Sequence, residues 1–133
     1  MRYGEGAVSC ADVCINHDYD VEDSEFYVER ATCARREHRC VECGGTISVQ
    51  DRYWRGSGKN DGRVWTVKTC SLCYEIRRAF VCGSWIFGEL WEAIREEMFP
   101  IWNERGPIDC LAKLESREAR DKCREEYRVW LEV

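Results

Sequence analysis

The segments His38-Arg39-Cys40-Val41-Glu42-Cys43-Gly44-Gly45 and Thr69-Cys70-Ser71-Leu72-Cys73 decide the fold of this 133-residue chain. Each contains two cysteines separated by two residues, a spacing that lets one short loop span an edge of a tetrahedral metal site. Glycines after the first pair give the backbone the freedom to turn its amides toward the sulfur atoms. The predicted ligands of one structural zinc ion are therefore Cys40, Cys43, Cys70 and Cys73.

A β-hairpin is predicted between the two cysteine pairs. Tyr53-Trp54-Arg55 and Val64-Trp65-Thr66-Val67 flank the segment Lys59-Asn60-Asp61-Gly62. Aromatic and β-branched residues suit a half-buried strand, while Asn, Asp and Gly tolerate the positive φ of a tight turn.

Helices are predicted from the second pair onward, because apolar residues then recur at steps of three and four. The first helix starts at Cys70, where the positive end of its dipole stabilises thiolates. A second helix is capped by Ser84 and stops at Pro100, and an amphipathic helix ends the chain. The expected buried stripes are Cys73, Ile76, Arg77 and Phe80; Phe87, Leu90, Trp91, Ile94 and Met98; and Ala119, Cys123, Tyr127 and Trp130.

Charge is segregated along the chain, whose net charge is −5. Residues 1–29 carry one basic and eight acidic side chains, whereas residues 30–78 carry eleven basic and five acidic ones. We predict an acidic N-terminal arm (1–29), a four-cysteine zinc-binding module (30–82) and a helical C-terminal extension packed on that module (83–133). The arm is expected to be irregular, and a solvated charged tail is the commonest outcome for such a run. The alternatives are that it covers the basic module or presents DNA-like negative charge to a host protein.

The order of knuckle, hairpin and helix resembles the treble-clef zinc finger over roughly residues 38–80. The segments 38–45, 51–53, 61–62 and 69–73 look like small uncharacterised bacteriophage and prophage proteins with zinc fingers of the treble-clef or zinc-ribbon type. The expected fold class is thus a small α+β zinc-binding domain: a treble-clef-like zinc knuckle, β-hairpin and helix, followed by two or three C-terminal helices. The resemblance implies a zinc site and a phage context, but no reaction.

A second zinc ion is an alternative use of the remaining cysteines. Its candidate ligands are Cys10, Cys14, His17, Cys33 and Cys82, with Cys82 the favoured addition to the pair at 10 and 14. The looser spacing leaves open that Cys10, Cys14 and Cys33 are incidental thiols. Cys110 and Cys123 are expected in the core, where a thiol behaves as a small hydrophobe.

Catalysis is not expected. A closed site of four cysteines leaves no coordination position for water or substrate. The only histidines, His17 and His38, both precede the first pair. HNH-type nucleases place a catalytic histidine on the hairpin of a similar zinc scaffold, and this hairpin carries none.

The preferred function is a zinc-stabilised, non-enzymatic interaction module that binds a protein partner, host-encoded if the phage resemblance holds. The alternative is a regulator that binds DNA or RNA through the basic hairpin residues Arg52, Arg55, Lys59 and Arg63. The hairpin aromatics have two interpretations, a base-stacking surface or core packed against the helix. The acidic pI of about 5.2 favours the protein partner.

The sequence indicates a soluble, cytoplasmic protein, which for a phage protein means the host cytoplasm. It shows neither an apolar leader nor an apolar run of about 18 residues, and no membrane partner is expected. In a reducing cytoplasm, ten cysteines are more typical of metal binding than of disulfides. The pattern does not define the oligomeric state.

Overall fold

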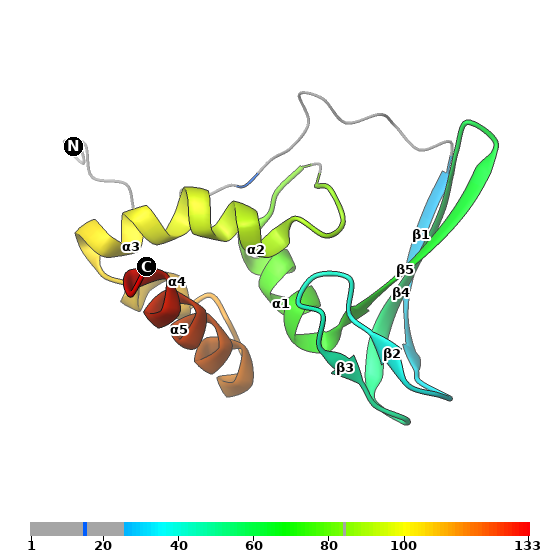
Figure 1. Ribbon diagram of the computed structural model, residues 1–133, viewed down its shortest axis with the longest axis horizontal. Helices are drawn as coiled ribbons and strands as arrows, with labels where there is room; N and C mark the ends of the chain where they lie inside the picture. The colour runs from blue at the N-terminus through cyan, green and yellow to red at the C-terminus, as the bar shows by residue number, and fades with distance from the viewer. Residues whose placement is uncertain (1–14, 16–25, 84) are drawn as a thin grey trace.

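The computed structural model describes residue 15, residues 26–83 and residues 85–133, and these form a small α+β fold. A β-sheet lies on one side of the molecule and most of the helices gather on the other, with helix α1 (Ser71–Phe80) between them (Figure 1). Among the described residues, no helix has the length and apolar character needed to cross a membrane.

The sheet has three antiparallel strands in the order β1 (Phe26–Cys33), β4 (Arg52–Asn60) and β5 (Arg63–Cys70). Strands β4 and β5 form the predicted hairpin, with Asn60 paired to Arg63. The two turn residues, Asp61 and Gly62, have φ values of 52° and 76°. Both are positive, as the right-handed twist of a two-residue hairpin requires.

Strand β1 was not predicted, and its start lies inside the segment predicted as an irregular arm. It pairs with β4 from Phe26↔Lys59 to Cys33↔Arg52. The prediction is therefore wrong for residues 26–29. These residues gain their backbone hydrogen bonds from a strand more than 20 positions away, and local sequence periodicity does not report such a pairing.

Helix α1 follows β5 directly, and its buried residues are the predicted Cys73, Ile76, Arg77 and Phe80. Before the hairpin, the short strands β2 (His38–Arg39) and β3 (Thr46–Ile47) pair with each other and enclose the first cysteine pair.

A continuous helical stretch follows, but its boundaries differ from the prediction. It starts at Leu90 with α2 (Leu90–Ala93), passes through the π-helical segment η2 (Ile94–Met98) and ends with α3 (Phe99–Arg105). The proposed cap Ser84 lies outside the described residues. Pro100 does not end the helix, because it occupies the first turn of α3, where its missing N–H is tolerated and the wider π turn precedes it.

The last helices, α4 (Ile108–Leu111) and α5 (Arg117–Leu131), close the helical part of the core. Ala119 and Cys123 on the predicted stripe of α5 are fully buried. Tyr127 and Trp130 on the same stripe pack against α3, and four aromatic rings meet there with centroids 5.1–5.9 Å apart. The four rings are those of Phe99, Trp102, Tyr127 and Trp130.

Candidate metal centre

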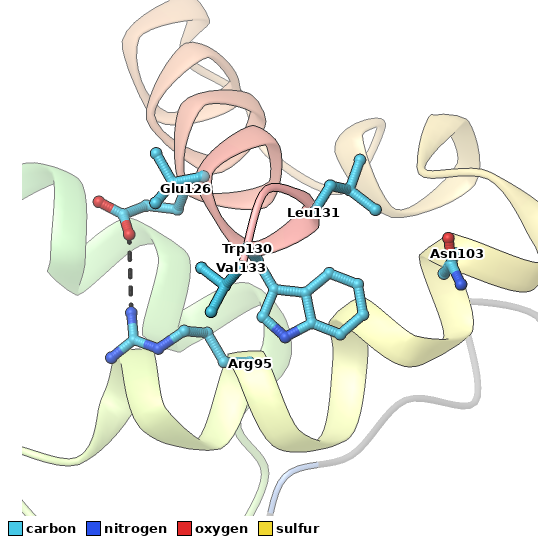
Figure 2. Close-up of a pocket in the computed structure, with 7 residues that line it drawn as sticks. Arg95, Asn103, Glu126, Trp130, Leu131 and Val133 are labelled. Atoms are coloured by element: carbon cyan, nitrogen blue, oxygen red, sulfur yellow. Dashed lines mark ion pairs between the residues drawn. The ribbon is translucent and has the colours of Figure 1, made fainter.

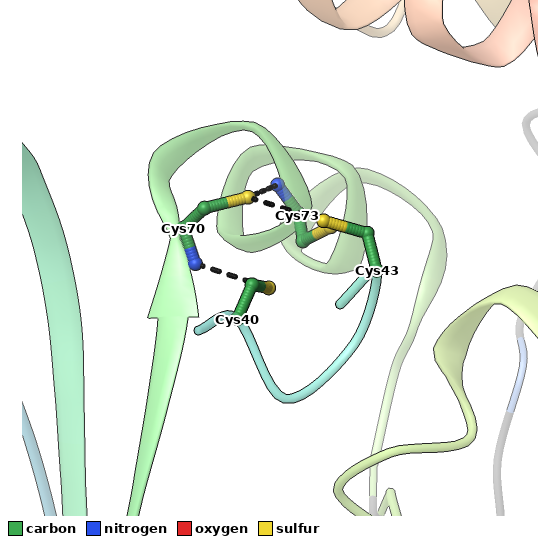
Figure 3. A group of neighbouring side chains, drawn as sticks. All are labelled: Cys40, Cys43, Cys70 and Cys73. Atoms are coloured by element: carbon green, nitrogen blue, oxygen red, sulfur yellow. Dashed lines mark hydrogen bonds between the residues drawn. The ribbon is translucent and has the colours of Figure 1, made fainter. Parts of the chain in front are cut away.

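Four cysteine sulfurs converge where the short strands, the end of β5 and the start of α1 meet (Figure 3). All four Sγ atoms lie within 4.8 Å of one another, and those of Cys43 and Cys70 are 4.0 Å apart. A tetrahedral zinc site with Zn–S bonds of about 2.3 Å separates its sulfurs by about 3.8 Å. The sulfur-only donor set and the spacing therefore fit one zinc ion.

The first pair lies in a tight knuckle between β2 and β3. Gly44 has a φ of +73°, and the backbone closes through Gly44 N donating to Cys40 O (3.0 Å) and Cys40 N donating to Gly45 O (2.9 Å). This turn points two amides at sulfur: those of Glu42 and Gly45 lie 3.4 Å from Cys40 Sγ and Cys43 Sγ, respectively. The geometry of the turn thus matches the role predicted for its glycines.

The second pair uses the N-terminus of α1. Cys70 is the N-cap residue, and its Sγ accepts a hydrogen bond of 3.4 Å from Cys73 N. A thiolate at this position satisfies a free helix amide and lies at the positive end of the helix dipole. Cys70 N also donates to Cys40 Sγ at 3.3 Å, which joins the two pairs directly.

The crowded sulfurs perturb one another's protonation. Hydrogen bonds from Cys70 and Cys73 lower the pKa of Cys40, and the same contacts with Cys40 raise the pKa of Cys73 and, to about 12, that of Cys70. A thiolate on Cys40 is thus favoured, and its charge opposes loss of the protons of Cys70 and Cys73. A divalent cation would replace those protons and allow all four sulfurs to be charged.

The helical part of the chain also reaches the sulfurs, which sequence reasoning missed. Trp91 of α2 donates its indole N–H to Cys73 Sγ at 3.4 Å. Lys122 of α5 lies with its ammonium 5.7 Å from the Trp91 ring centroid. Although burial opposes it, Glu126 and then the charges of Cys43 and Cys73 raise the pKa of Lys122. Both side chains therefore favour negative charge on the sulfur cluster.

Glu42, inside the first Cys-x-x-Cys pair, was also missed. Its Oε1 accepts hydrogen bonds from Gly88 N (3.1 Å) and Leu90 N (3.0 Å), at the start of α2. Glu75 of α1 acts in the same way on α5: its carboxylate accepts from Glu115 N (2.8 Å), Ser116 N (2.9 Å) and Ser116 Oγ (2.7 Å). Two glutamates thus connect the cysteine-bearing segments to the helices.

The predicted second metal site is not assembled among the described residues. Cys10, Cys14 and His17 lie outside them, and in the described part of the chain three or more potential ligands gather only at the four-cysteine cluster. Cys33 is exposed at the end of β1. Cys82 is disulfide-bonded, so it offers no thiolate to a metal ion.

The two cysteines expected in the core are both buried: Cys110 is 2% exposed and Cys123 fully buried. Cys110, however, is disulfide-bonded, as Cys82 is. The expectation that the cysteines of this chain avoid disulfides therefore fails for these two residues.

The predicted nucleic-acid residues are divided between the two faces of the sheet. Successive residues of a strand point to opposite faces, so Arg55 and Lys59 share one face of β4, while Arg52 points to the other. Arg63 directly follows the hairpin turn and is exposed. His38 is not a ligand: its ring lies 5.3 Å from that of Tyr53, and burial together with nearby cations lowers its pKa.

A separate hollow of about 750 Å³ lies at the C-terminal end of α5 (Figure 2). Trp130, Leu131 and Val133 line it, together with the ion pair between Arg95 and Glu126 at 3.6 Å. Its described lining residues include no group of three potential metal ligands.

Comparisons of the chain with protein-family models, with curated proteins and with solved structures find no match.

Proposed function

We propose that the chain is a non-enzymatic interaction module whose fold is held together by one structural zinc ion. The observation that carries this proposal is the convergence of Cys40, Cys43, Cys70 and Cys73 within 4.8 Å. Five N–H groups, four of them backbone amides, donate to these sulfurs, as expected for thiolates held for a metal.

The proposed architecture is a treble-clef finger. Support comes from the order of its parts: a knuckle between β2 and β3, the β4–β5 hairpin, and α1 bearing the second pair in its first turn. Four sulfur ligands close the coordination sphere, and for this reason we propose a structural rather than a catalytic ion.

Metal content tests the proposal. The purified protein should contain one zinc ion per chain by elemental analysis, and Cys70→Ser should lose it. Cys33→Ser is the matched control, because Cys33 is a free, exposed cysteine outside the cluster. Folded wild-type protein without zinc would contradict the proposal. Two zinc ions in wild type that fall to one in Cys14→Ser would instead establish the second site.

Two classes of partner follow from a module of this kind. The phage-like sequence pattern supports a host protein, the partner that the sequence favours. The concentration of cations on the sheet supports a polyanion. The second class has the more specific structural support.

A further inference from the structure

One face of the sheet is open and carries a row of positive charge. Arg55 at the centre of β4 pairs directly with Arg30 on β1 and with Lys68 on β5. Side chains at paired positions lie on the same face, about 5 Å from their neighbours. Like charges placed opposite one another destabilise a sheet, so this row is unfavourable for folding alone.

Two further cations border the same surface. Arg35 and Arg36, in the loop after β1, line a hollow of about 550 Å³ together with the row. Among the described residues, none of the five cations has a carboxylate within ion-pair distance. Three of the four arginines of α5 differ, because Arg117, Arg124 and Arg128 each pair with a carboxylate three or four positions away.

The opposite face of the sheet is packed by aromatic side chains. Trp54 stacks on Tyr74 of α1 with ring centroids 3.8 Å apart, and Trp65 stacks on Tyr27 at 5.8 Å. On the open face, Tyr53 is buried with 6% of its surface exposed. The cationic surface therefore offers contacts to phosphates but no exposed aromatic ring, among the described residues, on which a base could stack.

We propose that the open face, through Arg30, Arg35, Arg36, Arg55 and Lys68, binds the phosphate backbone of double-stranded nucleic acid without reading its base sequence. Arginine presents a fork of N–H donors that matches phosphate oxygens, and four of the five cations are arginines. This reverses the order of partners favoured by the sequence, because the fold gathers these cations on one surface. The inference rests on the proposed function, since zinc ligand Cys70 ends β5.

The test uses zinc-loaded protein and a fluorescein-labelled random DNA duplex of about 20 base pairs, with anisotropy measured between about 50 and 200 mM salt. Wild type should bind with an affinity that falls steeply with salt. Arg55→Glu should weaken binding at least about tenfold and reduce the log–log salt slope by about 1, the loss of one phosphate contact.

Arg63→Glu is the matched control, with the same charge change on the same hairpin. Its position lies five residues from Lys68 along β5, about 17 Å away and beyond a Debye length of about 10 Å at 0.1 M salt. Because salt screens charges at this distance, Arg63→Glu should change the duplex affinity by no more than about twofold. Arg30→Gln combined with Lys68→Gln should weaken binding as Arg55→Glu does.

A thermal melt separates binding from folding. Glutamate at position 55 would lie between Arg30 and Lys68, so Arg55→Glu should melt at the same temperature as wild type or higher and keep its zinc.

Equal duplex affinity in Arg55→Glu and Arg63→Glu, or no binding by wild type at low salt, would overturn the inference. Displacement of the duplex by poly-glutamate at equal charge would assign the surface to an acidic protein instead. None of these results would alter zinc content, so the zinc proposal is judged separately.

Discussion

The sheet half of the molecule (residues 26–80) and the helical half (residues 85–133) bury different kinds of side chains. The helical half buries large apolar groups such as Met98, Phe99 and Trp102. The sheet half also buries thiols, those of Cys40 and Cys73, and its large buried apolar groups are divided between strands and α1: Ile47, Tyr53, Ile76 and Phe80. A row of cations lines one face of its sheet. From this difference we expect the sheet half to depend more on metal binding by its four cysteines, and the helical half more on apolar packing.

Metal removal should give the largest effect and the clearest separation of the two halves. Structural zinc in small domains contributes an apparent free energy on the order of 10 kcal/mol that is also folding free energy. Chelation, compared with zinc-loaded protein in the same reductant because Cys82 and Cys110 are disulfide-bonded, should therefore unfold the sheet, while part of the helicity of α3 to α5 remains. Amide NMR spectra would report both halves together. Unchanged sheet resonances in metal-free protein would contradict the comparison.

Truncation of a side chain in the helical core should lower the stability of the helical half and leave zinc binding unchanged. Phe99→Ala removes a fully buried ring that contacts Trp102, Tyr127 and Trp130, and should cost about 3–5 kcal/mol in urea unfolding. Zinc content should stay at one per chain, because the ligands lie in the other half. Val129→Ala, at a residue that is 44% exposed, is the control and should change stability by less than about 1 kcal/mol. Loss of zinc in folded Phe99→Ala would show that the halves are not separable.

The smallest effect is expected at Glu75, which connects the two halves. Burial opposes ionisation of Glu75, but hydrogen bonds from Ser116 and Glu115 outweigh it and lower the pKa of the carboxyl group in the folded state. Its stabilisation is complete above the unfolded pKa of about 4.5 and is lost as the pH falls through the folded value. Glu75→Gln should cost about 1 kcal/mol at neutral pH, as the loss of a helix cap does.

Acid also protonates the cysteine thiolates, but it does so equally in wild type and in Glu75→Gln. The difference in unfolding free energy between the two proteins therefore reports on the Glu75 carboxylate alone. The difference in unfolding free energy between wild type and Glu75→Gln should shrink as the pH falls below about 4.5 and the wild-type carboxylate takes up its proton. A difference that is constant with pH would show that the charge of Glu75 is not what stabilises the start of α5.

The sequence predicted those features whose residue pattern lies within a short segment of the chain. The spacing within each cysteine pair, the Asp61-Gly62 turn and the buried stripe of α1 each depend on residues close together in the chain. The meeting of the two cysteine pairs, Cys40 with Cys70 at a separation of 30 positions, was predicted instead from the four ligands that a zinc ion needs. Strand β1 was missed because its partner is β4, and the helix was stopped too early because tolerance of Pro100 depends on the π turn before it. The cation row could have been found from the alternation of strand residues, but only once β1 was recognised as a strand.

The role of Glu42 at the start of α2 could not have been predicted from the sequence. A glutamate between two ligand cysteines resembles any solvated residue of a knuckle, and its role at α2 appears only when residues 88–90 are brought beside it.

The position of β1 has a consequence for the order of folding. β1 leaves the ribosome before its partner β4, and the loop between them contains the first cysteine pair. The β4–β5 hairpin can close quickly through its two-residue turn, whereas β1 must close a longer loop, which is slower. Once Cys70 and Cys73 share an ion with Cys40 and Cys43, that intervening segment is tethered to the finished hairpin. The metal would then act kinetically, by shortening the search through which the first strand finds its place.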